Sequence, residues 1–191
     1  MEEILNICLQ DRLFYEDSGG GVTLSGGEAL TQPHFSLALL QALKKEKIHT
    51  AIETSGYAPV EIFDEISEAA ELIIFDIKHY DAARHFEGTG VHNGLILTNL
   101  KNALARGKAI IPRIPVIPGY NDSAEDAFHF AALLESMGIK RVQLLPFHQY
   151  GEKKYELYNI PYYMKNTPQL HREDLENYCQ VFFSREINSF F

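Results

Sequence analysis

The segment Gly19–Leu30, GGGVTLSGGEAL, decides how the rest of the chain is interpreted. Its short apolar run, Val22–Leu24, predicts a β-strand that leads directly into the small-residue turn Ser25–Gly27 and Glu28. Glycines in such a turn let the backbone approach a ligand closely, and Glu28 offers an anion to an ammonium group. An ordinary strand-to-helix turn explains the same residues, because the helix dipole favours an acidic residue at a helix start. Both interpretations stay open on this segment alone.

Length, charge and composition restrict the class of protein. The chain has 191 residues, 46% of them hydrophobic, and is expected to bury a core and to form a single domain over residues 1–191. Its formal net charge of −9 argues against an extended nucleic-acid-binding surface. No apolar run approaches the roughly 20 residues that span a bilayer, and the N-terminus has no signal-peptide pattern. A cytoplasmic protein without membrane contacts is therefore expected.

Apolar strand segments alternate with amphipathic helical segments along the chain. Strands are predicted at 22–24, 49–52, 72–75, 109–117 and 141–145. Helices are predicted at 1–15, after Pro33, at 60–70, at 93–106, from a cap at Asp122 or Ser123 to Met137, and at 171–184. The stretch 149–166 has no clear period, and 188–191 is expected to be a tail. This alternation predicts an α/β fold with a parallel sheet.

Polar side chains follow the predicted strands. In parallel α/β folds, ligand sites form at the carboxyl ends of the strands. These ends carry Gly26, Gly27, Glu28, Glu53, Thr54, Ser55, Asp76, Ile77, Lys78, Arg113 and His148. One rim of the predicted sheet would hold all of them.

Each of these polar residues also has a purely structural explanation. Asp76 and Lys78 share one face of their strand, where a strand-end ion pair is as reasonable as a ligand contact. Glu53, Thr54 and Asp76 supply oxygen atoms that suit a small cation or sugar hydroxyls. His148 could make a structural hydrogen bond or contact a nucleoside. Their common position at strand ends favours a ligand site.

Five stretches of the chain together resemble one known family. They are GGGVTLSGGEAL, ETSG, IIFDIKHYD, RIPVIPGYND and LLPFHQYGEKKY, in this order. The chain resembles the activating enzymes of glycyl radical enzymes, a group within the radical S-adenosylmethionine (SAM) superfamily that includes pyruvate formate-lyase activating enzyme. The resemblance runs from Gly19 to about Tyr155. It implies a partial (β/α)6 TIM-like barrel of the radical SAM type, which binds SAM across the strand ends.

The resemblance also implies roles for the strand-end residues. The methionine amino group of SAM would be received by Gly26, Gly27 and Glu28, and Arg113 would lie near the SAM carboxylate. The rest of the SAM site would be lined by Asp76, Ile77, Lys78 and His148. A monovalent cation would be held by Glu53, Thr54 and Asp76 together with the Ile74 carbonyl. The family has Asp where this chain has Glu53.

Members of this family reduce SAM through a 4Fe–4S cluster. The resulting 5′-deoxyadenosyl radical removes a hydrogen atom from a glycine of a partner glycyl radical enzyme. Three cysteines in a CxxxCxxC motif hold the cluster in the family. This chain has only Cys8 and Cys179, far apart, so neither that motif nor a disulfide framework is predicted.

The missing motif leads to further expectations about this chain. The resemblance implies a barrel that is truncated at its N-terminal strand, with no catalytic residue among those present and no radical generation by this chain alone. A missing first strand would leave a sheet edge exposed, which predicts self-association through that edge. Two other functions stay open: a non-catalytic module that binds SAM or the partner enzyme, and a different α/β barrel that uses Glu53, Asp76 and His148 in acid–base chemistry without iron.

Overall fold

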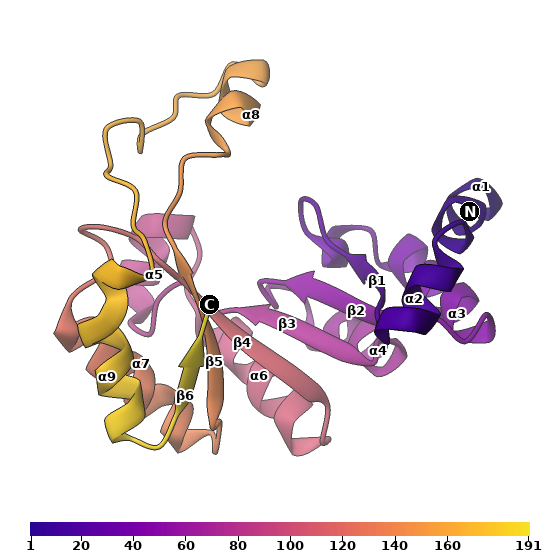
Figure 1. Ribbon diagram of the computed structural model, residues 1–191. Coiled ribbons are helices and arrows are strands. Elements are labelled where there is room, and N and C mark those ends of the chain that lie inside the picture. Colours follow the sequence, from indigo (N-terminus) through magenta and orange to yellow (C-terminus); the bar gives the residue numbers. More distant parts are fainter. The chain divides into compact units, whose positions relative to one another are not determined.

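The computed structural model describes residues 1–191 and divides into two compact units (Figure 1). The first unit comprises Met1–Ile77 and Asp81–Pro112. The second comprises Lys78–Tyr80 and Arg113–Phe191. The short segment Lys78–Tyr80 therefore belongs to a different unit from the residues on both sides of it.

Three parallel strands, in the order β1-β2-β3, form the sheet of the first unit. Their bounds are Gly21–Leu24 for β1, His49–Thr54 for β2 and Leu72–Asp76 for β3. Val22 lies opposite Thr50, and Ile52 lies opposite Ile73. The predicted strands are confirmed, but β2 continues through Glu53 and Thr54. β1 lies at the end of the strand order, where a free edge was expected.

Four α-helices and a short 3-10 helix follow the strands of the first unit. They are η1 (Ala29–Thr31), α3 (Pro33–Lys45), α4 (Val60–Ala69), α5 (Ala82–Thr89) and α6 (Gly94–Ala105). α3 begins at a proline and ends with Lys44 and Lys45, an arrangement that suits the helix dipole. α3 packs on α4 and β2, and α4 packs on α6. The sequence had given no indication of α5.

The core of the first unit lies between these helices and the sheet. Phe63 of α4 and Phe75 of β3 are both fully buried, and their rings meet edge to face with centroids 5.9 Å apart. Leu40 and Leu43 of α3 and Ile52 of β2 are equally buried. Burying these side chains is the main source of stability for the unit, because each removes a large apolar surface from water. The core thereby fixes the strand ends that carry the polar residues.

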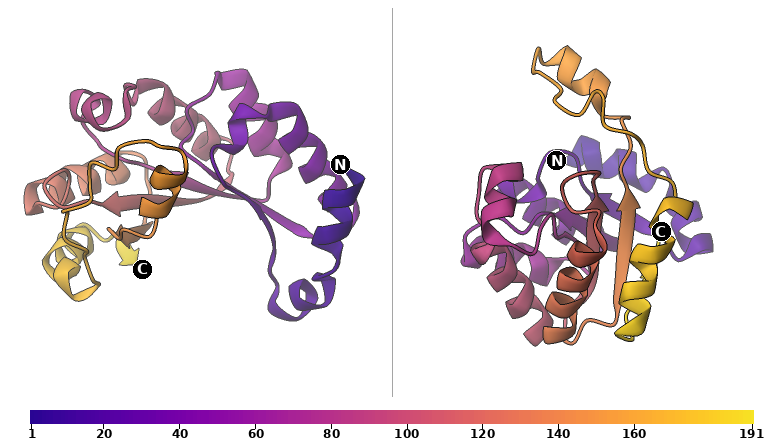
Figure 2. Two further views of the ribbon diagram at one scale, coloured as in Figure 1. Left: turned by 90° about the horizontal axis from the view of Figure 1, so that it is seen from above. Right: turned by 90° about the vertical axis from the view of Figure 1, so that its left-hand side faces the viewer.

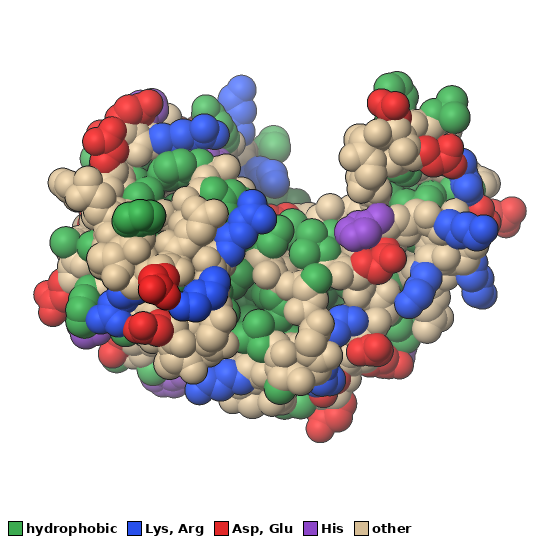
Figure 3. Space-filling view, turned by 60° about the horizontal axis from the view of Figure 1, so that its bottom comes forward, with side chains coloured by type: hydrophobic (Ala, Val, Ile, Leu, Met, Phe, Trp, Pro, Cys, Tyr) green, Lys and Arg blue, Asp and Glu red, His purple; other side chains and the backbone are tan.

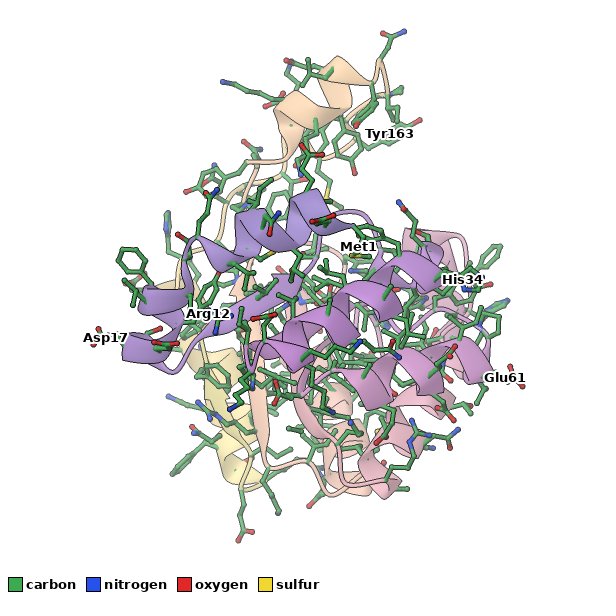
Figure 4. The ribbon with its side chains drawn as sticks, turned by 90° about the vertical axis from the view of Figure 1, so that its right-hand side faces the viewer. Met1, Arg12, Asp17, His34, Glu61 and Tyr163 are labelled. Carbon is green, nitrogen blue, oxygen red and sulfur yellow. The ribbon has the colours of Figure 1, made fainter.

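The N-terminal segment forms two helices where one was predicted. α1 spans Glu2–Leu9 and α2 spans Arg12–Ser18, with a break at Asp11, a residue type that favours helix starts. Arg12 turns toward α3, and its guanidinium donates to the Glu46 carboxylate at 2.5 Å and to the Glu46 carbonyl oxygen at 3.3 Å (Figure 4). This contact joins the start of α2 to the C-terminal end of α3. Neither helix contains a buried residue.

The second unit has parallel strands in the order β4-β5-β6. β4 spans Ala109–Val116, of which Arg113–Val116 lies in this unit; β5 spans Arg141–Pro146 and β6 spans Asn188–Phe190. The prediction of a tail at 188–191 is wrong, because Asn188 pairs with Arg141 and its N–H donates to the Lys140 carbonyl oxygen at 2.9 Å. Such a short strand depends on a partner 47 positions earlier in the chain, and local sequence does not reveal it.

The helices of the second unit are α7 (Ala124–Ser136), α8 (Glu152–Leu157), η2 (Glu173–Leu175) and α9 (Glu176–Ser184). Ser123 caps α7 in a capping box with Asp126, which confirms one of the two predicted caps. α7 packs on α9 through a core that includes Phe130 and Phe182, both fully buried. The segment around α8 stands away from these helices (Figures 1 and 2).

The surface carries charges of both signs. On the face drawn in Figure 3, lysine and arginine side chains are interspersed with aspartate and glutamate. None of the helices combines the length and the apolar character that crossing a membrane requires.

Candidate functional site

The carboxylate of Glu28 accepts four hydrogen bonds at the strand ends of the first unit. Its Oε1 accepts hydrogen bonds from the Leu30 N–H at 3.2 Å and from Thr54 Oγ1 at 2.7 Å. Its Oε2 accepts from the N–H of Ser55 at 2.9 Å and from Ser55 Oγ at 2.6 Å. These donors use the lone-pair directions of the carboxylate. Glu28 therefore ties the turn after β1 to the end of β2.

The glycine turn before Glu28 opens onto a pocket. Gly26 has φ +106°, a conformation that side chains disfavour, and a Cβ atom on Gly26 or Gly27 would meet nothing within 4 Å. The pocket has a volume of about 230 Å³. Its lining includes Ser25, Gly27, Glu28, Gln32, Phe35 and Ser36. The first unit thus places an open space beside an exposed backbone turn and an acidic side chain.

Glu53 and Asp76, two residues predicted to hold a cation, lie in the last two positions of neighbouring strands. Glu53 lies opposite Ile74 in the ladder between β2 and β3, and Asp76 is the last residue of β3. The Glu53 carboxylate accepts a hydrogen bond from Ser25 Oγ. Thr54 is buried, and its hydroxyl already donates to Glu28 and accepts from the Gly56 N–H at 2.9 Å. The cation site stays a prediction.

In the second unit, a buried asparagine holds the backbone of Lys78, one of the predicted site residues. Asn121 is fully buried, and its Nδ2 donates to the carbonyl oxygens of Lys78 at 3.1 Å and of Pro115 at 2.8 Å. Its Oδ1 accepts from the Ile117 N–H at 2.7 Å. The backbone of Lys78 is thereby fixed next to β4, the strand that carries Arg113. The side chain of Asn121 takes no part in the cap of α7, which Ser123 forms.

His148 is held much less firmly than Asn121. It follows β5 and is exposed, and its ring stacks on Tyr150 with the centroids 4.4 Å apart. The Tyr150 N–H donates to His148 Nδ1 at 3.4 Å, which leaves Nε2 as the protonated nitrogen of the neutral ring. The side chain can therefore offer an imidazole face or an N–H to a ligand.

Two buried asparagines were missed as candidate residues. Asn121 lies two positions before the cap residue Ser123, so a local explanation was available for it. Asn99 lies on the buried face of α6 with Ile96, Leu100 and Ala103. A polar residue three positions after Ile96 and four before Ala103 was the signal that could have identified it.

Comparison with known proteins identifies the family. A family model described as the radical SAM superfamily matches residues 1–131. The chain belongs to the radical SAM superfamily. This membership confirms the resemblance that the strand-end motifs indicated.

Relatives of this radical SAM chain include activating enzymes. The choline trimethylamine-lyase activating enzyme of Oleidesulfovibrio alaskensis is 42% identical and matches 92% of this chain and 58% of its own length. The isethionate sulfite-lyase activating enzyme of the same organism is 44% identical and matches 81% of this chain and 50% of its own length. The chain therefore spans little more than half the length of these curated relatives.

A solved structure supports the predicted radical SAM fold. The crystal structure of a domain of pyruvate-formate lyase-activating enzyme from Bacteroides vulgatus is 26% identical to this chain, with a TM-score of 0.74. The match covers 90% of this chain and 98% of that domain. The predicted α/β fold of the radical SAM type is confirmed.

Family membership implies SAM and a 4Fe–4S cluster as cofactors. The chain's residues fit SAM but not the cluster. The open pocket beside Gly27 and the anion at Glu28 fit the methionine end of SAM. The cluster needs several thiolates, whereas Cys8 belongs to the first unit and Cys179 to the second. No group of three or more His, Cys, Asp or Glu side chains is arranged to hold a metal ion. The residues of this chain therefore do not supply a cluster site.

Proposed function

We propose that this chain is the SAM-binding core of a glycyl radical enzyme activating enzyme. The single observation that carries the proposal is the turn Ser25–Glu28, which lines an open pocket and is tied to the end of β2 by hydrogen bonds to the Glu28 carboxylate. The names of the relatives support the same class of activity. The protein to which this chain corresponds would act on a glycyl radical enzyme.

The proposed roles follow the chemistry of the SAM molecule. The ammonium group would meet the backbone of Gly26 and Gly27 and the negative charge of Glu28. The SAM carboxylate would meet the guanidinium of Arg113, which is always charged. The remaining parts of SAM would contact Asp76, Ile77, Lys78 and His148, and a monovalent cation would bind Glu53, Thr54 and Asp76.

The protein's contribution to the reaction is to bind and orient SAM. When bound, SAM supplies the 5′-deoxyadenosyl group that the family uses to take a hydrogen atom from a partner's glycine. The hydrogen bonds to Glu28 hold its carboxylate in place before the ligand arrives, so binding does not have to order this side chain. We assign no catalytic residue to this chain.

Binding of SAM to the chain tests the proposal directly. Isothermal titration calorimetry should detect saturable binding, and Glu28→Gln should weaken it by about tenfold, which corresponds to 1.4 kcal/mol. Glu61→Gln is the matched control, because Glu61 is an exposed carboxylate on α4 (Figure 4). An absence of saturable binding, or equal affinities for wild type and Glu28→Gln, would contradict the proposal.

A second experiment tests whether this chain can generate a radical by itself. After anaerobic reconstitution with iron and sulfide, the chain should yield no 5′-deoxyadenosine from SAM, because its two cysteines cannot provide the cluster's thiolates. Appreciable 5′-deoxyadenosine would show that the cluster assembles by another route. Sedimentation at increasing protein concentration tests the proposed self-association through β1.

A further inference from the structure

Asn99 is fully buried in α6 and bonds to the backbone that follows β2. Its Nδ2 donates to the carbonyl oxygen of Gly56 at 2.8 Å and to that of Ala58 at 2.9 Å. Its Oδ1 has no hydrogen-bond partner. An apolar side chain would avoid this unpaired oxygen, but it would leave the carbonyl oxygens of Gly56 and Ala58 without these two donors. The two N–H donors are therefore what an asparagine specifically adds here.

The loop that Asn99 holds also carries the donors for Glu28. The Gly56 N–H donates to Thr54 Oγ1 at 2.9 Å, and Thr54 Oγ1 donates to Glu28 Oε1 at 2.7 Å. Ser55, between them, donates to the same carboxylate through both its N–H and its hydroxyl. A continuous hydrogen-bonded path therefore runs from Asn99 through Gly56 and Thr54 to Glu28.

Close packing at Gly56 restricts the movement of this loop. Its φ is +71°, and a Cβ atom built on it would lie 2.3 Å from the ring of Phe75. Phe75 is fully buried and packs on Phe63, so the ring has little room to yield. The loop is thus packed against the core on one side and bonded to Asn99 of α6 on the other.

We propose that Asn99 is a positioning residue that fixes the orientation of the Glu28 carboxylate through the loop Ser55–Ala58. The inference deepens the proposed function and rests on it, because Glu28 matters for SAM only if the chain binds SAM. The hydrogen bonds of the path exist without a ligand. The positioning itself can therefore be tested without SAM.

The first measurement is amide hydrogen exchange at Ser55 in the ligand-free chain. Asn99→Leu removes both donors, and the Ser55 N–H should then exchange about tenfold faster, since its bond to Glu28 loses its support. Asn102→Leu, on the same helix but not fully buried, is the matched control and should leave Ser55 unchanged. Asn99→Ala, which also removes both donors but adds no bulk, is measured in parallel in case the leucine variant does not fold.

The second measurement is SAM affinity in a double-mutant cycle. Asn99→Leu should weaken SAM binding by about tenfold, equal to 1.4 kcal/mol. The same change in a Glu28→Gln background should have no further effect, because Asn99 acts through Glu28. If Asn99 only stabilised the fold, Asn99→Leu would lower the free energy of unfolding, and its effect on SAM affinity would be the same with and without Glu28→Gln.

The outcomes distinguish the two proposals. Unchanged Ser55 exchange in a folded Asn99 variant, or an equal loss of SAM affinity in the Glu28→Gln background, would overturn the role of Asn99. If the wild-type chain binds no SAM, the proposed function fails. In that case faster Ser55 exchange would still establish that Asn99 positions Glu28.

Discussion

The strand ends of the two units hold their polar side chains in different ways. In the first unit, Glu28 accepts four hydrogen bonds from neighbouring residues, and the loop after β2 is fixed between Asn99 and Phe75. In the second unit, the buried Asn121 fixes only backbone, and His148 is exposed and held by Tyr150 alone. The first unit therefore presents a prearranged anion, whereas the second presents an adjustable imidazole.

This difference shows that a polar residue at a strand end can stabilise the fold, offer a group to a ligand, or do both. Glu28 stabilises the fold through its donors and at the same time offers negative charge. His148 contributes little to the fold and is free to adapt to a ligand. Substitutions should therefore change stability and ligand affinity together in the first unit, and separately in the second.

The largest effect is expected from Gly56→Ala in the first unit. The new methyl group would combine a positive φ with a contact of 2.3 Å to the Phe75 ring, and should lower the free energy of unfolding by about 3 kcal/mol. Gly90→Ala is the control, because Gly90 has φ +80° but nothing within 4 Å of its Cβ position, and should cost about 1 kcal/mol. Urea denaturation measures both, and equal losses would show that the loop after β2 is not tightly packed.

Asn121→Ala should have the next largest effect, in the second unit. It removes three hydrogen bonds of a fully buried side chain and leaves two carbonyls and an N–H unpaired, which should cost about 2 kcal/mol. Asn177→Ala, at an exposed position of α9, should change stability by less than about 0.5 kcal/mol. If both alanine variants unfold at the same urea concentration as wild type, Asn121 does not fix the backbone at Lys78.

Tyr178→Phe should have a smaller effect that depends on pH. Burial, with nearby acidic groups, raises the pKa of the Tyr178 phenol above its ordinary value of about 10, and its hydroxyl donates to the Asn121 carbonyl oxygen at 3.1 Å. Above about pH 10 the unfolded phenol ionises while the folded one stays protonated, so the free energy of unfolding falls as pH rises. Below that pH the phenylalanine variant should lose about 1 kcal/mol.

Alkaline denaturation checks this prediction. The stability of Tyr178→Phe should decline less steeply above pH 10 than that of wild type. Tyr163→Phe is the control, because Tyr163 is 91% exposed and should follow the wild-type curve. Identical pH dependence in all three proteins would contradict the assigned role of burial.

His148→Ala should have the smallest effect on stability. The side chain is exposed, and its contacts are limited to Tyr150, so the free energy of unfolding should change by less than about 0.5 kcal/mol. SAM affinity, measured by calorimetry, should nevertheless fall several-fold if His148 contacts the ligand. A large loss of stability in His148→Ala would show that His148, like Glu28, is held by the fold, and the difference between the two units would not stand.

The sequence predicted the alternation of strands and helices because its signals are local. Apolar runs marked β1 to β5, and Pro33 and Ser123 marked helix starts. It did not predict β6, whose pairing with β5 is a long-range contact, or the break at Asp11, where Arg12 bonds to Glu46, 34 positions away.

The candidate site was likewise predictable from the sequence only where its signals are local. The acidic residue and glycines after β1 were recognisable because they form one short motif. Asn99 was not, because its partner Gly56 lies 43 positions earlier and its amide looks like an ordinary helix residue. Local patterns indicated the residues that are proposed to face a ligand, whereas the residues that hold them in place depend on distant contacts.

The segment Lys78–Tyr80 limits how the chain can be divided. His79 is buried against Tyr120 and Phe130, and the Tyr80 hydroxyl donates to Asp126 at 3.0 Å, so these residues complete the core of the second unit. A cut after Pro112 would leave them on the other fragment. The C-terminal half, expressed alone, should therefore be an incomplete protein, and its folding should be recovered only when the N-terminal fragment is supplied.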